Sequence, residues 1–161
     1  MTSSDLQQLY QQILLDHAKA KHGFSAEPLT ALAAPAEQNG LRTAQSHQVN
    51  TTCGDEVTVR VAVSGAGRIE DLAWRGEGCS ISMASASVLS DEVRGKSAAD
   101  AQALLGTFRE MLRSRGTIEP DEETMGDAAA FAGVSRYPAR VKCAMLPWVA
   151  LEAALVEAES R

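Results

Sequence analysis

The chain has 161 residues and a formal net charge of −6, with 45% hydrophobic and 22% charged residues. This length and composition predict a single domain (residues 1–161) with its own core, and the negative charge argues against nucleic acid or an anionic membrane as the main partner. No segment is apolar over the thickness of a bilayer, and the N-terminus lacks the basic and apolar regions of a signal peptide, so we expect a cytoplasmic protein.

The first half of the chain predicts one helix and one β-hairpin, separated by a loop. Residues 4–19 form an amphipathic pattern that places apolar side chains and His17 on one face. Residues 22–46 contain two glycines, two prolines and many small residues without a clear period, so we expect an extended loop there, with room for a short turn of helix or an irregular strand. In residues 56–63 every second residue is valine, and a second strand around residues 69–75 follows the turn SGAGR, which predicts an antiparallel hairpin.

The second half predicts three helices. A run of small residues after the glycine-rich turn GEGC predicts the first, and Ser97 caps the second. Residues 113–133 form an acidic linker and insertion, and Pro138 begins the final helix, in which Pro147 predicts a kink or break that frees the carbonyl of Cys143. This order of elements indicates an α+β fold with a small antiparallel β-sheet covered on one face by helices.

The three cysteines are an odd number in a chain without a recognisable export signal, which argues against a disulfide framework. The remaining interpretations of these cysteines are buried thiols, a metal site or reactive sulfur. Cys53 and Asp55 flank Gly54 at the start of the strand, on one strand face and roughly 6.7 Å apart, so their short side chains could converge on one ion. A capped strand start is the alternative, and this stretch alone favours it.

The other two cysteines also lie at the ends of predicted elements. Cys79 is placed at the start of a helix, where free N–H groups and the helix dipole stabilise a thiolate; a cysteine buried beneath a turn is the alternative. Cys143 lies early in the final helix, with Arg140 three residues before it on the helix surface. A basic side chain beside a sulfur favours the thiolate and suits an acidic partner, although a solvated basic face has the same sequence.

These element ends can meet at one end of a small α+β domain. Three cysteines and Asp55 would then complete a tetrahedral set of ligands, and a sulfur-rich set of this kind suits Zn²⁺ best among common ions. For the three histidines, His17, His22 and His47, we expect surface or capping positions.

Four sequence blocks carry a resemblance to a known family: LYQQILLDH, VNTTCGDEV, GEGCSISMASASVLSDEVRGKS and FAGVSRYPARVKCAMLPW. The chain resembles the U-type (IscU/NifU N-terminal-like) iron–sulfur cluster assembly family, and within it the SufU type. The resemblance implies the SufE/NifU-like fold and one Zn²⁺ held by Cys53, Asp55, Cys79 and Cys143. It also implies a sulfurtransferase in which Cys53 accepts persulfide sulfur from the cysteine desulfurase SufS, with Arg140 as our candidate docking residue, and passes it to a downstream Suf scaffold or another acceptor.

Two features distinguish this chain from the IscU type within that family. IscU-like proteins carry a histidine directly before the third cysteine, whereas this chain has Lys142, and the 63 residues between Cys79 and Cys143 resemble the longer SufU-type segment. The alternatives are an IscU-type scaffold that assembles a transient Fe–S cluster on the same ligands, and a non-catalytic adaptor stabilised by zinc.

Overall fold

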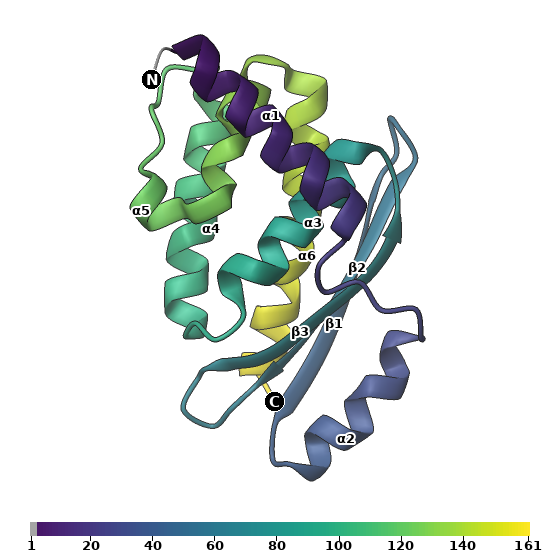
Figure 1. Cartoon of the computed structure of the whole chain (residues 1–161). Coiled ribbons are helices and arrows are strands. Elements are labelled where there is room, and N and C mark those ends of the chain that lie inside the picture. Colours follow the sequence, from purple (N-terminus) through teal and green to yellow (C-terminus); the bar gives the residue numbers. More distant parts are fainter. Residues whose placement is uncertain (1–2) are drawn as a thin grey trace.

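The computed structural model describes residues 3–161, in which a three-stranded sheet lies against a group of helices (Figure 1). The strands are β1 (Arg42–Asn50), β2 (Asp55–Val63) and β3 (Ile69–Glu77). The helices are α1 (Ser3–Ala20), α2 (Ala33–Gln38), α3 (Ser80–Val93), α4 (Ala98–Arg113), α5 (Glu122–Met125) and α6 (Pro138–Glu159), with the 3₁₀ segments η1 (Leu29–Leu32) and η2 (Gly126–Arg136).

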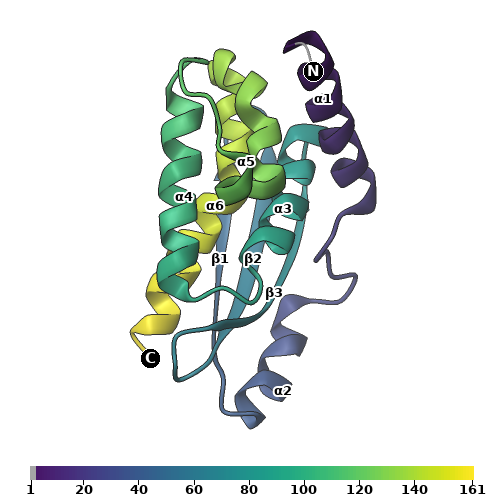
Figure 2. The same cartoon turned by 60° about the vertical axis from the view of Figure 1, so that its left-hand side comes forward.

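The predicted α+β fold is confirmed. The strands form an antiparallel sheet in the order β1-β2-β3, and α6 packs across β1 and β2. Figures 1 and 2 show α1, α3, α4 and α6 on the same side of the sheet, while α2 lies apart, near the end where β1 begins. The alternating valines of β2 face these helices and are completely buried: Val57, Val59, Val61 and Val63.

The loop expected over residues 22–46 contains more regular structure than the short turn of helix or irregular strand allowed for it. Residues 29–38 form η1 and α2, and β1 begins at Arg42. The sequence of β1, RTAQSHQVN, contains little apolar alternation because Ala44 is its only buried hydrophobic side chain. This edge strand pairs with β2 as far as Asn50 opposite Asp55, so the sheet contains a hairpin that sequence periodicity missed.

Helix α6 is not broken at Pro147. It continues from Pro138 to Glu159 with the proline inside it. The part of the prediction that concerns the carbonyl of Cys143 is supported, because this oxygen lies 3.3 Å from the hydroxyl of Ser82 on α3. A neighbouring α3 side chain thus approaches the backbone position that proline leaves without an N–H donor.

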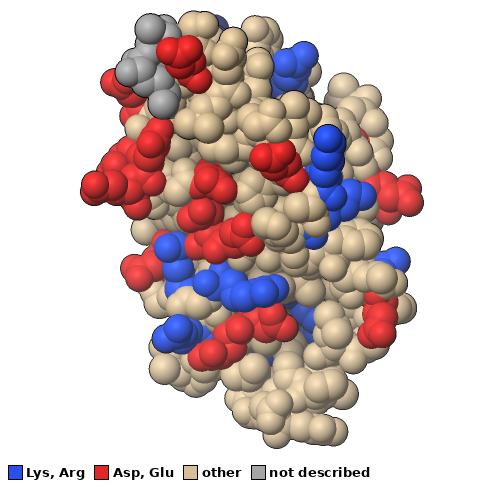
Figure 3. Space-filling model, viewed as in Figure 1, with Lys and Arg blue, Asp and Glu red and all other residues tan. Residues whose placement is uncertain are grey.

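Charged side chains are distributed in patches on the surface. Figure 3 shows acidic side chains gathered over α5, at the left of that face, with basic and acidic groups interspersed below them. The 3₁₀ segment η2 that follows α5 contributes Ala128, Ala129 and Phe131 to the core. Among the described helices, none has both the length and the apolar character needed to cross a membrane.

Candidate metal centre

The β1–β2 hairpin and the starts of two helices bring the three cysteines and Asp55 to one place. The hairpin turn covers residues 51–54, in which Gly54 adopts a φ of +79° and donates a 2.8 Å hydrogen bond to the carbonyl of Asn50. Cys53 lies exposed in this turn rather than on the strand face that its spacing predicted. Asp55, the first residue of β2, is buried.

Helices α3 and α6 contribute one cysteine each. Cys79 is the N-cap residue of α3, as the sequence predicted, and its side chain is exposed. Cys143 is the sixth residue of α6 and is buried. The ligand atoms of Cys53, Asp55 and Cys143 all lie within 4.8 Å of one another. Cys79 is not in this group, although its sulfur lies 3.3 Å from Asp55 Oδ2.

The distance between two of the sulfurs fits a tetrahedral zinc site. The sulfurs of Cys53 and Cys143 are 3.7 Å apart. With Zn–S bonds of about 2.3 Å, two thiolates on a tetrahedral ion would be separated by roughly 3.8 Å. A carboxylate oxygen beside three sulfurs also matches the ligand types that zinc accepts.

Asp55 is held by hydrogen bonds from the first turn of α3. Its Oδ1 accepts from the backbone N–H of Cys79 at 3.1 Å, and its Oδ2 accepts from the hydroxyl of Ser82 at 2.5 Å. Burial by itself would raise the pKa of this carboxyl, but hydrogen bonds from Ser82, Cys79 and Cys53 outweigh it and hold the pKa below its ordinary value. The carboxylate form that a metal requires is therefore favoured in the folded chain.

Cys143 differs from its sequence-based interpretation. Burial raises the pKa of this thiol well above its usual range, and hydrogen bonding with Cys79 and Cys53 adds to the effect. The basic residues Arg140 and Lys142 therefore do not give Cys143 the thiolate character that we expected from their proximity in sequence. In this setting a bound cation, rather than a basic side chain, is the group that would favour its deprotonation.

Comparison with known proteins assigns the family. The model of the NifU-like N-terminal domain matches residues 29–144, more than half of the chain. The chain belongs to this family. The resemblance described from the four sequence blocks is thereby confirmed, and with it the connection to iron–sulfur cluster assembly.

Relatives of this NifU-like chain carry two different functional names. It is 36% identical over 155 residues to the iron–sulfur cluster assembly scaffold protein IscU of Streptococcus pyogenes, covering 96% of this chain and 87% of that protein. It is 34% identical over 158 residues to the zinc-dependent sulfurtransferase SufU of Bacillus subtilis, covering 98% and 96%. A solved structure from Fervidobacterium islandicum, described as an iron–sulfur cluster assembly scaffold protein for the SUF system, is 32% identical with a TM-score of 0.70, covering 89% and 93%.

Three residues that surround the site of this NifU-like chain were missed at the sequence level. Ser82 contacts Asp55, and the side-chain amide of Asn50 lies 4.0 Å from the sulfur of Cys143. A Cβ atom on Gly78 would lie 2.8 Å from the carboxyl carbon of Asp55, so only glycine leaves room there for the carboxylate. Gly78 belongs to the glycine-rich turn before Cys79, and that turn was the one available signal.

Arg140 lies beside the centre but is not part of it. Its guanidinium lies 5.0 Å from the ring centroid of Tyr137, and both residues line a groove of about 290 Å³ between α1, η2 and the start of α6. Ile81, two residues after Cys79, also lines this groove, which therefore borders the metal centre. A partner that filled the groove would contact Arg140 and Ile81 together.

The group of candidate ligands that contains Cys53 includes no histidine. His17, for which we expected a surface or capping position on the apolar side of the first helix, is buried, and its two ring nitrogens lie 2.7 Å from Ser87 Oγ and 2.8 Å from Asp127 Oδ2. His22 and Asp91 lie near it, 2.7 Å apart. Because both ring nitrogens of His17 are hydrogen-bonded, this residue links α1 to α3 and η2.

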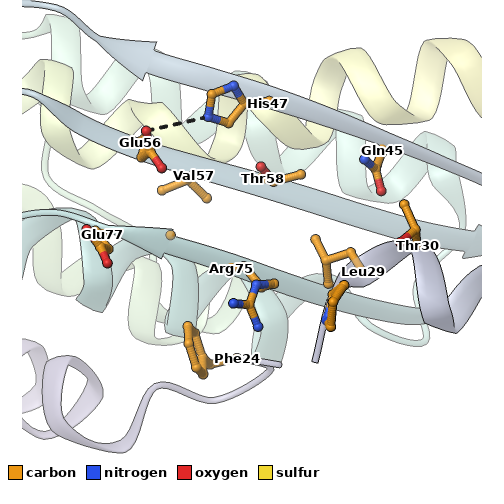
Figure 4. Close-up of a pocket in the computed structure, with 12 residues that line it drawn as sticks. Phe24, Leu29, Thr30, Gln45, His47, Glu56, Val57, Thr58, Arg75 and Glu77 are labelled. Carbon is orange, nitrogen blue, oxygen red and sulfur yellow. Dashed lines mark ion pairs between the residues drawn. The ribbon is translucent and has the colours of Figure 1, made fainter. Parts of the chain in front are cut away.

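A cavity of about 440 Å³ lies on the sheet face turned away from α6 (Figure 4). Phe24 and Leu29 form an apolar wall, while Arg75 and an ion pair between His47 and Glu56, 3.9 Å long, contribute charge. None of the four candidate ligands lines this cavity. It is therefore separate from the metal centre.

Proposed function

We propose that this protein is a zinc-bound sulfur acceptor in iron–sulfur cluster assembly, which takes persulfide sulfur from a cysteine desulfurase of the SufS type. The observation that carries the proposal is the position of Cys53, an exposed thiol on a four-residue turn among two further cysteines and a buried aspartate. Cys53, Asp55, Cys79 and Cys143 would hold one Zn²⁺, which keeps the thiols deprotonated at neutral pH and shields them from oxidation.

Cys53 is the acceptor in this proposal because its surroundings leave it the most free to move. Cys79 begins a helix, and its backbone N–H is bonded to Asp55. Cys143 is buried within α6. A turn residue can swing outward without unwinding a helix, so Cys53 can reach a sulfur donor in a docked enzyme.

The transfer is a thiol–disulfide type of exchange. The Cys53 thiolate attacks the terminal sulfur of the desulfurase persulfide, a new S–S bond forms on Cys53, and the S–S bond of the donor breaks. The desulfurase cysteine leaves as a thiolate, so charge and electrons balance without an external oxidant or reductant. Arg140 in the adjacent groove would hold an acidic segment of the donor, and a downstream Suf scaffold or another acceptor would receive the sulfur.

The test uses a desulfurase loaded with ³⁵S from labelled cysteine. We expect the wild-type protein to take up label that a reducing agent releases, and we expect Cys53→Ala to take up none. Thr52→Ala, a change at the neighbouring exposed position of the same turn, is the matched control and should accept label normally. Undiminished transfer to Cys53→Ala would exclude Cys53 as the acceptor.

A scaffold that assembles an Fe–S cluster on the same residues is the second candidate. It is favoured by the name of the 36% identical relative from Streptococcus pyogenes. The exposed Lys142 stands directly before Cys143, where the IscU type carries a histidine, and this difference favours the acceptor instead. A stable cluster after anaerobic reconstitution, with iron replacing zinc, would support the scaffold, and unchanged desulfurase turnover on addition of the protein would support a non-catalytic adaptor.

A further inference from the structure

Ser82 on α3 lies at the centre of the contacts around the candidate ligands without being one of them. Its side chain is completely buried, and its hydroxyl oxygen lies 2.5 Å from Asp55 Oδ2, 3.3 Å from the carbonyl of Cys143 and 3.6 Å from the sulfur of Cys79. One hydroxyl therefore approaches three of the four candidate ligand residues. A buried hydroxyl is stable only when it is hydrogen-bonded, so these contacts also explain why a serine is accommodated there.

The hydroxyl has one proton, and the distances assign it. The 2.5 Å separation from Asp55 Oδ2 is a short, charge-assisted hydrogen bond, whereas the carbonyl of Cys143 lies 0.8 Å farther away. That carbonyl is free to face α3 because Pro147, four residues later, has no N–H to donate to it. Ser82 thus donates its proton to Asp55, and the carbonyl of Cys143 in α6 lies close by as a weaker alternative acceptor.

The consequence is a carboxylate fixed at both oxygens. The backbone N–H of Cys79 holds Oδ1, and Ser82 holds Oδ2, the oxygen nearest the sulfur of Cys79. Groups that hydrogen-bond to a metal ligand and fix its orientation raise metal affinity, because the ligand then loses less conformational freedom when the metal binds. Resting on the proposed metal centre, we infer that Ser82 is a positioning residue, which orients Asp55 towards the cysteine sulfurs and thereby strengthens zinc binding.

The chain contains a matched control for this role. Ser85, one turn later on α3, is also completely buried, and it donates a 2.5 Å hydrogen bond to a carbonyl of α6, that of Ala144. It accepts a 3.0 Å hydrogen bond from the indole N–H of Trp148. Ser85 is therefore a buried serine between α3 and α6 like Ser82, but its hydrogen bonds do not involve Asp55.

The experiment measures the zinc dissociation constant by competition with a chromophoric chelator for the wild type, Ser82→Ala, Ser85→Ala, Asp55→Ala and the double variant Ser82→Ala/Asp55→Ala. We expect Ser82→Ala to weaken zinc binding by about 10- to 100-fold, the range for outer-shell ligands. We expect Ser85→Ala to leave the constant within about twofold. In the Asp55→Ala background, removal of Ser82 should have almost no further effect, because two residues that act through one contact are not additive. Circular dichroism of the metal-free variants verifies the fold.

Each contrary outcome identifies what fails. An unchanged constant for Ser82→Ala, or an equal loss with and without Asp55, would overturn the positioning role. A wild type that does not bind one zinc, or whose constant is insensitive to Asp55→Ala, would overturn the metal centre itself. Coupling between Ser82 and Asp55 together with normal sulfur transfer by Cys53→Ala would keep the inference and reject the proposed acceptor.

Discussion

Substituting Gly78 by alanine should displace the candidate aspartate ligand without changing any ligand. The backbone at Gly78 does not have a positive φ, so alanine is compatible with the local conformation. Its new Cβ, however, would lie 2.8 Å from Asp55 Cγ and 2.9 Å from Oδ1. The buried carboxylate cannot rotate away freely, because Cys79 and Ser82 hold its two oxygens.

The size of the displacement follows from these contacts. Ordinary contacts of a Cβ begin at 3.4 Å, so the carboxyl carbon must move by about 0.6 Å. Metal–ligand distances tolerate deviations of only about 0.2 Å. The carboxylate would therefore leave its position in the zinc site, and we expect zinc binding to weaken by at least the 10- to 100-fold typical of altered ligand support.

Chelator competition measures this loss, and Gly106→Ala provides the control. Gly106 lies in α4, where a Cβ atom would meet nothing within 4 Å, so that variant should bind zinc like the wild type. In an Asp55→Ala background the Gly78→Ala change should lose most of its effect. Zinc affinity within twofold of wild type for Gly78→Ala would refute the steric reasoning, and with it the assignment of Asp55 as a ligand.

Other parts of the molecule yield three further predictions. Burial, together with the like charge of Asp127, raises the pKa of Glu92, so the folded chain loses stability as pH rises and this carboxyl becomes charged. Glu92→Gln should therefore have a higher free energy of urea unfolding than wild type at neutral pH, and the two free energies should converge below about pH 4. A difference that is constant with pH would contradict the ionisation of Glu92 as its cause. Phe108 is completely buried and stacks on Trp148 with ring centroids 4.4 Å apart, so Phe108→Ala should lower the free energy of unfolding by about 3–5 kcal/mol, and a loss below 1 kcal/mol would contradict this packing. Arg140→Glu should slow sulfur uptake from the desulfurase most strongly at low salt with zinc affinity unchanged, and equal slowing at all salt concentrations would argue against electrostatic docking.

The sequence predicted those parts of the fold whose side-chain pattern is local. The valines of β2 and the helices α1, α4 and α6 carry clear periodicity, and α3 is a run of small residues after a glycine-rich turn. Each was located within a few residues. Strand β1 was missed because it is an edge strand with polar residues on most positions, so its position depends on pairing with β2 rather than on its own pattern. Without β1, the turn that holds Cys53 could not be recognised as a hairpin turn.

The sequence identified the candidate ligands but not the residues that surround and support them. Cysteine and aspartate are chemically distinctive, so Cys53, Asp55, Cys79 and Cys143 stand out in any sequence. Ser82 and Gly78 are common residue types, and their importance arises only from distances to a residue more than 20 positions away. The burial that raises the pKa of Cys143 is likewise a property of the packed helix and not of its basic neighbours in sequence.

The distribution of the candidate ligands along the chain affects when the site can form during biosynthesis. Cys53, Asp55 and Cys79 lie in the hairpin and at the start of α3, whereas Cys143 lies in α6, which is synthesised after all of these elements. A nascent chain therefore carries two exposed thiols before their third sulfur partner has been made. Zinc that arrives during this interval would meet an incomplete set of ligands. We therefore expect stable zinc binding only after α6 has docked onto the sheet, so that zinc binding marks the completion of folding.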